Sequence, residues 1–295
     1  MLRFSLVLLF AGSVLMTGCD EAVVSADEIE AYFTLWGALD PSSDLQALRV
    51  VPIEREIGTD GGAPIDATMT STDLTTGATT SWRDSVVTFE NGTSGHVFLA
   101  DFRPQYGRRY RISVERSDGA ATVARIRVPP LVDPFRETTN VVAGNVLYPT
   151  LWPGAPQLNN IQVTYLLENG NCDRFSMTIP FEGDAEPFEF GWRTTIRLAD
   201  DADRILGSLD NRPHAVARIT LSAEVASEDW RPPGGVFDPE IFIEPGTFSN
   251  VEGGFGFVGG SYEAETDWVP LSDELTRVGF RTVGFGACAS SGTPS

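Results

Sequence analysis

The two histidines of the chain set the first limit on the chemistry that its side chains can perform. They are His96 and His214. A zinc site built from several histidines is excluded by that count, and neither HExxH nor the GxSxG sequence of serine hydrolases occurs. His96 alternates with Phe98 on an expected strand, and His214 follows Pro213 in an expected turn. We therefore predict no catalytic residue and no metal ligand.

A glycine pattern at residues 254–259 matches the GxGxxG sequence of dinucleotide-binding proteins. That pattern binds a dinucleotide only where it joins a strand to a helix. Residues 260–270 show no amphipathic helical pattern, so we predict no cofactor. We expect instead a glycine-rich strand or loop where backbones approach closely, with Phe255 and Phe257 packed on one side.

Two acidic clusters, at residues 182–186 and 200–203, carry enough oxygen atoms for calcium. Neither has the spacing of an EF-hand loop. The chain has 41 acidic residues, so solvated acidic clusters are expected and we predict no calcium site. Paired carboxylates for glycoside hydrolysis depend on a separation that only the fold defines, and the sequence selects no pair.

The strongest local charge feature is a group of arginines. Residues 103–127 contain seven arginines and two acidic residues, a net charge of +5 within a chain of net charge −20. An Asp-Gly turn between two alternating runs predicts a β-hairpin, which places Arg109, Arg111, Arg125 and Arg127 on one face. Guanidinium groups bind phosphate and carboxylate, so this face is a candidate site for an anion or an acidic partner. The alternatives are pairing with the protein's own acidic residues, or packing against a second domain.

The overall composition excludes some classes of partner. All 21 basic residues are arginine, against 41 acidic residues, and the sequence pI is about 4.4. Such a chain lacks the basic surface that a nucleic-acid binder or a surface-adsorbed lipid binder needs. A hydrophobic content of 42% is typical of a globular protein. Six tryptophans and eighteen phenylalanines would allow sugar-stacking sites, although aromatic residues in alternating runs belong more often to the core.

The N-terminus predicts a lipid anchor. Arg3 precedes a 13-residue apolar run, too short to span a bilayer, and Met16-Thr17-Gly18-Cys19 resembles a bacterial lipobox. In that class the cysteine is acylated and the chain is cut before it. We predict a signal peptide over residues 1–18, lipidated Cys19, an acidic tether over 19–30 and a place in the outer membrane of the cell envelope. The alternative is a secreted protein in which Cys19 is incidental.

The remaining cysteines form an even pair. If Cys19 carries lipid, Cys172 and Cys288 are left in an oxidising compartment, where disulfides form and persist. We predict a disulfide between them, which would connect the C-terminal end to the second domain. The alternative is two free, buried thiols.

Short alternating runs separated by Gly, Pro, Asn and Asp predict a mainly β protein. Residues 31–128 predict an immunoglobulin-like or carboxypeptidase-regulatory-like sandwich, and the prolines of 129–136 predict a linker. A second β-rich domain with one or two short helices is expected over 137–288, followed by a flexible tail over 289–295. Besides the arginine hairpin, the expected strands cover residues 31–39, 48–53, 67–72, 85–89, 96–102, 140–148, 161–168, 174–180, 194–198 and 215–225.

Two segments of the second domain have helical character. Residues 200–203 predict an acidic cap for a helix that carries Ile205, Leu206 and Leu209 and ends before Pro213. Residues 271–277 predict a second helix with Ser272 as its cap.

Two further segments resemble a family of bacterial lipoproteins of unknown function. Residues 247–260 (TFSNVEGGFGFVGG) are similar to the family's closing motif, sNieGGxGxFgg, and residues 102–111 (FRPQYGRRYR) are similar to its pGrtYtLrV strand. Members carry a lipobox and two β-rich domains. They are similar in setting to proteins found beside TonB-dependent outer-membrane receptors of the starch-utilisation type.

The resemblance implies a location and a class of partner, and it supplies no catalytic residue. The leading hypothesis is a non-enzymatic accessory or binding lipoprotein that works beside an outer-membrane receptor. The alternatives are a glycan- or nutrient-binding surface lipoprotein that uses exposed tryptophans, and an envelope hydrolase, which no sequence feature positively favours.

Overall fold

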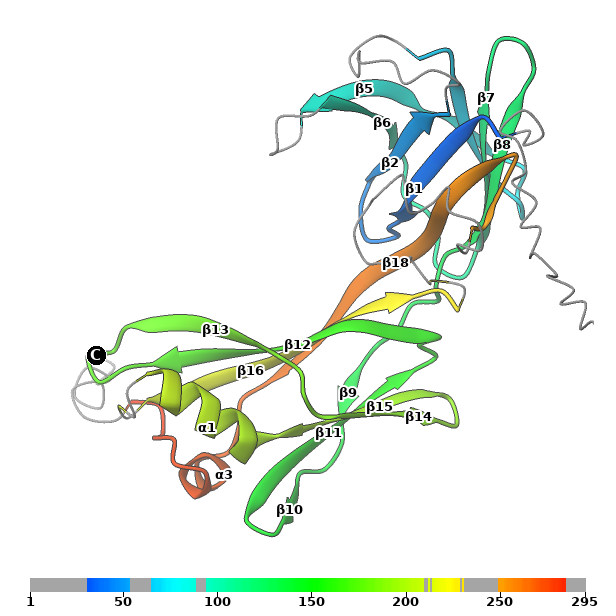
Figure 1. Cartoon of the computed structure of the whole chain (residues 1–295). Coiled ribbons are helices and arrows are strands. Elements are labelled where there is room, and N and C mark those ends of the chain that lie inside the picture. The colour runs from blue at the N-terminus through cyan, green and yellow to red at the C-terminus, as the bar shows by residue number, and fades with distance from the viewer. Residues whose placement is uncertain are drawn as a thin grey trace, which may run out of the picture. The chain divides into compact units, whose positions relative to one another are not determined.

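The computed structural model describes residues 31–53, 65–88, 94–209, 212, 214–228, 230 and 249–284. These residues form eighteen strands and two helices, so the chain is mainly β, as the sequence predicts (Figure 1). The predicted signal peptide, Cys19 and the tether lie outside the described residues, as do Cys288 and the predicted tail.

The N-terminal half is a β-sandwich. One layer belongs to an eight-stranded sheet and contains, in spatial order, β1 (Phe33–Leu39), β2 (Leu45–Pro52), β6 (Ser94–Asp101) and β5 (Arg83–Thr88). The other layer has the order β17 (Val251–Glu252), β8 (Ala121–Arg127), β7 (Arg109–Glu115), β3 (Thr68–Asp73) and β4 (Thr79–Ser81). Period-two alternation directs one face of each layer inward, and the core between them includes Phe33, Leu35, Val50, Phe98, Ile112, Val114 and Ile126.

The C-terminal half continues the same eight-stranded sheet through β18 (Gly254–Trp268), β16 (Ala215–Ala226), β12 (Gln157–Glu168) and β13 (Arg174–Pro180). This half also has a five-stranded sheet of its own, called the second sheet below. It contains β10 (Asn140–Val142), β11 (Asn145–Pro153), β15 (Gly191–Arg197) and β14 (Asp184–Phe188), and β9 (Phe135–Arg136) pairs with β11. The helices are α1 (Leu198–Ser208) and α3 (Ser272–Arg277). The core of this half includes Tyr148, Trp152, Tyr165, Leu167, Ile205, Leu221, Leu275 and Phe280.

Strand β18 takes part in both halves of the described chain. Its first part pairs in parallel with β1, from Phe33 opposite Gly254 to Leu39 opposite Gly260. Its second part pairs antiparallel with β16 (Figure 1). Val258 is buried in the N-terminal core. Residues 251–260, which the sequence assigns to the domain over 137–288, therefore complete the N-terminal sandwich.

The parallel pairing explains the glycine pattern of β18. A Cβ atom on Gly256 would lie 2.0 Å from the carbonyl oxygen of Leu35, and the φ of Gly256 is 103°. Phe257 and Trp230 are buried in one apolar cluster, against which Phe255 packs. The interpretation of this segment as a glycine-rich strand with close backbone approach is confirmed.

Tyr262 of β18 forms hydrogen bonds with the predicted linker, residues 129–136. The hydroxyl of Tyr262 donates to the carbonyl of Pro130 at 2.9 Å and accepts the N–H of Val132 at 2.7 Å. The ring of Tyr106 lies edge-on to that of Tyr262, with 5.0 Å between centroids. Burial raises the pKa of Tyr262 to about 12, so its hydroxyl remains protonated at neutral pH.

Tyr262→Phe is expected to lower the free energy of unfolding by about 1–3 kcal/mol, because it leaves the buried N–H of Val132 without a partner. Urea denaturation followed by tryptophan fluorescence measures this loss. Tyr106→Phe is the matched control, because no hydrogen bond of the Tyr106 hydroxyl exists among the described residues. Equal losses in the two variants would show that the hydroxyl of Tyr262 has no special role.

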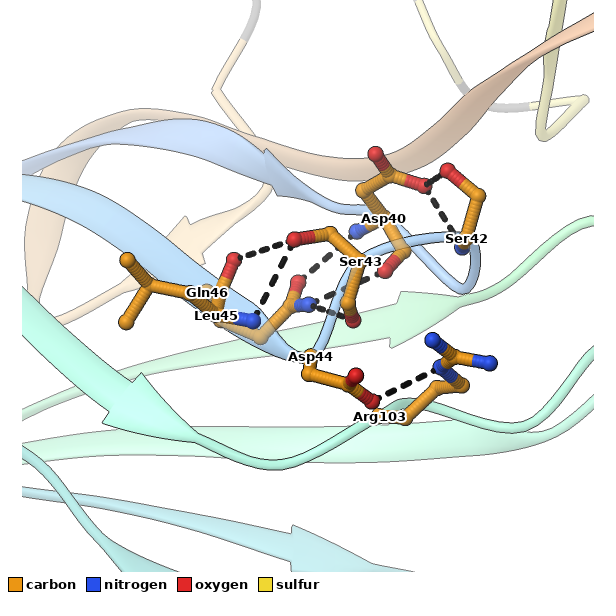
Figure 2. A network of polar contacts seen from close by, with 7 residues as sticks. All are labelled: Asp40, Ser42, Ser43, Asp44, Leu45, Gln46 and Arg103. Atoms are coloured by element: carbon orange, nitrogen blue, oxygen red, sulfur yellow. Dashed lines mark hydrogen bonds and ion pairs between the residues drawn. The ribbon is translucent and has the colours of Figure 1, made fainter.

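Side chains also fix the turn between β1 and β2, as Figure 2 shows. The buried amide of Gln46 donates to the carbonyls of Asp40 at 2.9 Å and Ser43 at 2.8 Å, and its oxygen accepts the N–H of Asp40 at 2.8 Å. The carboxylate of Asp40 accepts the N–H of Ser42 at 2.7 Å. These bonds satisfy backbone groups that the strands cannot pair, and so define the register of the hairpin.

The predicted cap of α1 is wrong. The helix begins at Leu198, and the N–H of Ala199 donates at 2.9 Å to the side chain of Asn145 on β11. Asp201, expected in the cap, instead points into the core. The helix ends at Ser208, before the predicted stop at Pro213.

The predicted cap of the second helix is also wrong. Ser272 is the first residue of α3, and Leu271 is its N-cap. The carboxylate of Glu274 accepts the N–H of Leu271 at 2.9 Å, so an acidic side chain from within the helix satisfies the N-cap amide.

Candidate functional site

The four arginines selected from the sequence lie together on one sheet face. Arg109 is opposite Arg127 and Arg111 is opposite Arg125 in the β7–β8 pairing. All four side chains are exposed, while Tyr110 and its partners on the other face are buried. We call Arg109, Arg111, Arg125 and Arg127 the arginine face.

The arginine face places like charges directly opposite one another, which destabilises a pair of strands. Arg125 forms an ion pair with Glu252 on the neighbouring β17. Among the described residues, Arg109, Arg111 and Arg127 have no carboxylate partner. Pairing within the described part of the chain thus accounts for one arginine of the four, and the exposure of all four side chains argues against burial beneath a second domain.

Other arginines of the same region are neutralised locally. Arg103 pairs with Asp44 at 2.9 Å (Figure 2), and Arg108 pairs with Asp73 at 2.6 Å. Although burial acts to raise the pKa of Asp73, its hydrogen bonds with Arg108 and with the turn amides lower that pKa to about 2. Within residues 103–127, the described arginines without a carboxylate partner therefore all lie on the arginine face.

Hydroxyl groups extend this face across β3 and β4. Thr72 is opposite Arg111 in the β3–β7 pairing, and its hydroxyl lies 3.2 Å from that of Thr79. Guanidinium groups are donors only, and hydroxyl groups can donate as well as accept. The surface is therefore suited to a ligand that is rich in acceptors, such as carboxylate or phosphate.

The two histidines belong to separate parts of the fold. His96 on β6 is 4% exposed, and its Nδ1 lies 2.8 Å from both carboxylate oxygens of Asp84. His214 precedes β16, is 6% exposed, and its Nδ1–H donates to the carbonyl of Arg212 at 2.8 Å. Strands β18, β1 and β2 separate β16 from β6. Each histidine is therefore buried and bonded to a neighbouring group, Asp84 for His96 and the carbonyl of Arg212 for His214.

Several residues of the acidic clusters make internal contacts: Asp200 accepts from Asn145, and Asp201 accepts from Tyr165. Glu182 pairs with Arg204, and Asp184 pairs with Arg197 at 2.5 Å. Within the described ranges, no group of three or more His, Cys, Asp or Glu residues is arranged to bind a metal ion.

Two buried tyrosine–carboxylate pairs connect the helices to the C-terminal core. The hydroxyl of Tyr165 donates to Asp201 of α1 at 2.5 Å, and that of Tyr148 donates to Glu274 of α3 at 2.8 Å. Burial raises the pKa of Asp201 to about 6, although the hydrogen bond from Tyr165 acts to lower it. Burial, together with the adjacent carboxylate, raises the pKa of both tyrosines. These pairs are structural, and no local sequence pattern indicated them.

A groove of about 960 Å³ lies on the second sheet, formed by β10, β11, β14, β15 and the residues after β9. Arg193 pairs with Glu137 at 2.7 Å across this surface, and the Arg197–Asp184 pair also lines it. Sequence reasoning missed the groove because its residues come from several strands that are separate in the chain.

Aromatic residues give no tryptophan platform on the surface. All six tryptophans are among the described residues, and none is exposed. Trp82, Trp152 and Trp230 are buried, and the other three are half-buried. The exposed tryptophans on which the glycan-binding alternative was based are therefore not present.

The membrane anchor and the disulfide remain predictions. Among the described residues, no helix has both the length and the apolar character to cross a membrane. Cys172 lies in the turn between β12 and β13, and its predicted partner Cys288 lies outside the described residues.

No protein-family model matches the chain, and no curated protein matches it in sequence. Among solved structures it is similar to bovine butyrophilin, with 13% identity over 65% of this chain and 92% of that chain, at a TM-score of 0.20. It is also similar to a pullulanase from Anoxybacillus sp. LM18-11, with 8% identity, 66% and 24% coverage of the two chains, and a TM-score of 0.23. The chain thus spans about a quarter of that pullulanase. Function therefore has to be argued from the sites themselves.

Proposed function

We propose that the protein is a lipid-anchored, non-enzymatic binding component of the cell envelope, working beside an outer-membrane receptor, and that an acidic partner binds its arginine face. One observation carries this proposal. Three exposed guanidinium groups without a described carboxylate partner lie in register with a fourth, on a chain of net charge −20.

Electrostatics makes such a face selective. An acidic partner is repelled by the protein's overall negative charge and attracted at this surface, which orients the encounter. Binding carboxylates would also relieve the repulsion between the facing arginines. Side chains two residues apart on a strand are separated by about 7 Å, the same repeat as alternate residues of an extended peptide. The arginine face therefore matches an extended acidic segment of a partner protein.

The test uses the full-length protein in detergent and two extended peptides, one with glutamate at alternate positions and the other with glutamine. We expect the glutamate peptide alone to bind, with an affinity that falls as salt is raised. Replacing the four arginines by glutamine should weaken binding tenfold or more, at about 1.4 kcal/mol for each factor of ten.

A matched control replaces four exposed arginines that have carboxylate partners: Arg83, Arg103, Arg174 and Arg218. It removes the same net charge, so it separates a local effect from a change in overall charge. In intact cells, crosslinking should recover an envelope receptor with the wild type and the control, and lose it with the arginine-face variant. Equal recovery by all three proteins would overturn the proposal.

A further inference from the structure

The groove on the second sheet has no unpaired arginine, in contrast to the arginine face, and three carboxylates line it against two guanidinium groups. Its two arginines, Arg193 and Arg197, are each paired with a carboxylate that also lines the groove. Arg193 and Glu137 are 40% and 29% exposed, so both remain within reach of a ligand. A paired guanidinium no longer attracts an anion strongly, which makes a neutral ligand the better match.

Polar groups without a described partner complete the lining. Glu186 is opposite Arg193 in the β14–β15 pairing, yet Arg193 bonds to Glu137 instead. Asn140 on β10 also lines the groove and is exposed. Neither Glu186 nor Asn140 has a side-chain partner among the described residues. Carboxylate, amide and guanidinium groups together offer donors and acceptors, which is the combination that hydroxyl groups require.

Aromatic surface lies beside these polar groups. Phe188 at the end of β14 is 42% exposed, and the guanidinium of Arg193 lies 5.6 Å from its ring centroid. Elsewhere on this sheet, Phe135 of β9 is opposite Leu151 of β11 and is 50% exposed. Exposed rings next to planar polar groups suit a ligand that has both apolar C–H faces and hydroxyl groups.

We propose that this groove binds a neutral oligosaccharide or a segment of a neutral polysaccharide. Its volume of about 960 Å³ is at the upper end of the range for ligand pockets, about 300–1,000 Å³, so it accommodates several sugar units. The site is separate from the arginine face and does not depend on the function proposed for that face.

The test is affinity electrophoresis of the full-length protein in native gels containing single soluble polysaccharides. The neutral probes are starch, xyloglucan, mixed-linkage β-glucan and galactomannan, and the anionic probes are polygalacturonate and alginate. We expect at least one neutral polysaccharide to retard the protein, and neither anionic one to do so. The arginine-face variant should be retarded as strongly as the wild type, which separates the two proposals.

Three substitutions locate the site. Glu186→Ala and Asn140→Ala should each weaken retardation about fivefold, the effect of losing one hydrogen bond of about 1 kcal/mol. Phe188→Ala should weaken it about tenfold, as expected for an aromatic residue on which a ligand packs. Phe190→Ala is the matched control, because Phe190 is in the same hairpin and is 67% exposed. Neither phenylalanine lines the groove itself, but Phe188 packs against the lining residue Arg193, and no such contact of Phe190 exists among the described residues.

Retardation that weakens with Glu186→Ala, Asn140→Ala and Phe188→Ala, but is unchanged with Phe190→Ala, would support the proposal. Three results would overturn it: no retardation by any neutral probe, retardation by the anionic probes only, or retardation that none of the three substitutions weakens. Circular dichroism of each variant identifies any loss that arises from unfolding.

Discussion

Gly256→Ala is expected to lower the free energy of unfolding by about 2–4 kcal/mol. The added Cβ would lie 2.0 Å from the carbonyl oxygen of Leu35, on the backbone of the paired strand β1. The φ of 103° adds strain, because side chains other than glycine rarely adopt it. Relief would require β1 and β18 to separate, which would weaken the N-terminal sandwich. Urea denaturation monitored by circular dichroism measures the loss.

Gly207→Ala is the matched control and is expected to have the opposite effect. Gly207 is exposed in α1, and nothing lies within 4 Å of the position of its added Cβ. Alanine in a helix is favoured over glycine by about 1 kcal/mol, so this variant should be more stable than the wild type. Unchanged stability of Gly256→Ala would contradict the close approach of β1 and β18.

Asp201→Asn is expected to stabilise the protein at pH 8 by up to about 3 kcal/mol and to change its stability little at pH 4. The pKa of Asp201 is raised from 3.8 to about 6 by burial, so the folded state binds a proton more tightly than the unfolded chain does. The stability due to this proton is fully present below pH 3.8 and is lost as pH rises through about 6. Asparagine carries no charge and can still accept from Tyr165.

Denaturation curves at several pH values between 4 and 8 provide the measurement. Asp200→Asn is the control, because Asp200 is the adjacent residue of the same helix and is exposed. It should leave stability nearly unchanged across the range. A gain from Asp201→Asn that did not increase with pH would show that the buried charge is not its cause.

The sequence predicted best what depends on neighbouring residues. The alternation in 109–127, with its Asp-Gly turn, defined both strands of the hairpin and the shared face of the arginines, because side-chain direction has a period of two. The interpretation of residues 254–259 as a strand also followed from local composition. The expected strand over 140–148 is instead a hairpin, in which Ala143 and Gly144 both have positive φ. That turn has no strong signal, because alanine seldom adopts such a conformation.

The features that could not be predicted from the sequence depend on contacts between residues that are far apart in the chain. The cap of α1 comes from Asn145, 54 positions before Ala199, so no local pattern encodes it. The groove combines Glu137 and Arg193, 56 positions apart, which the pairing of β9, β11 and β15 brings together. The arginine face itself was predicted, but the ion pair between Arg125 and Glu252 was not, because Glu252 lies on β17, more than 120 residues later in the chain.

The position of β18 imposes an order on biosynthesis. The ribosome finishes residues 31–128 first, yet β1 has no partner on one edge until residue 260 has been made. At about 5–20 residues per second, the unfinished sandwich waits on the order of ten seconds with an open edge, the kind of edge that invites pairing with other chains. The N-terminal sandwich therefore cannot be completed before most of the second half exists, and the pairing of β18 with β1 is the step that closes it.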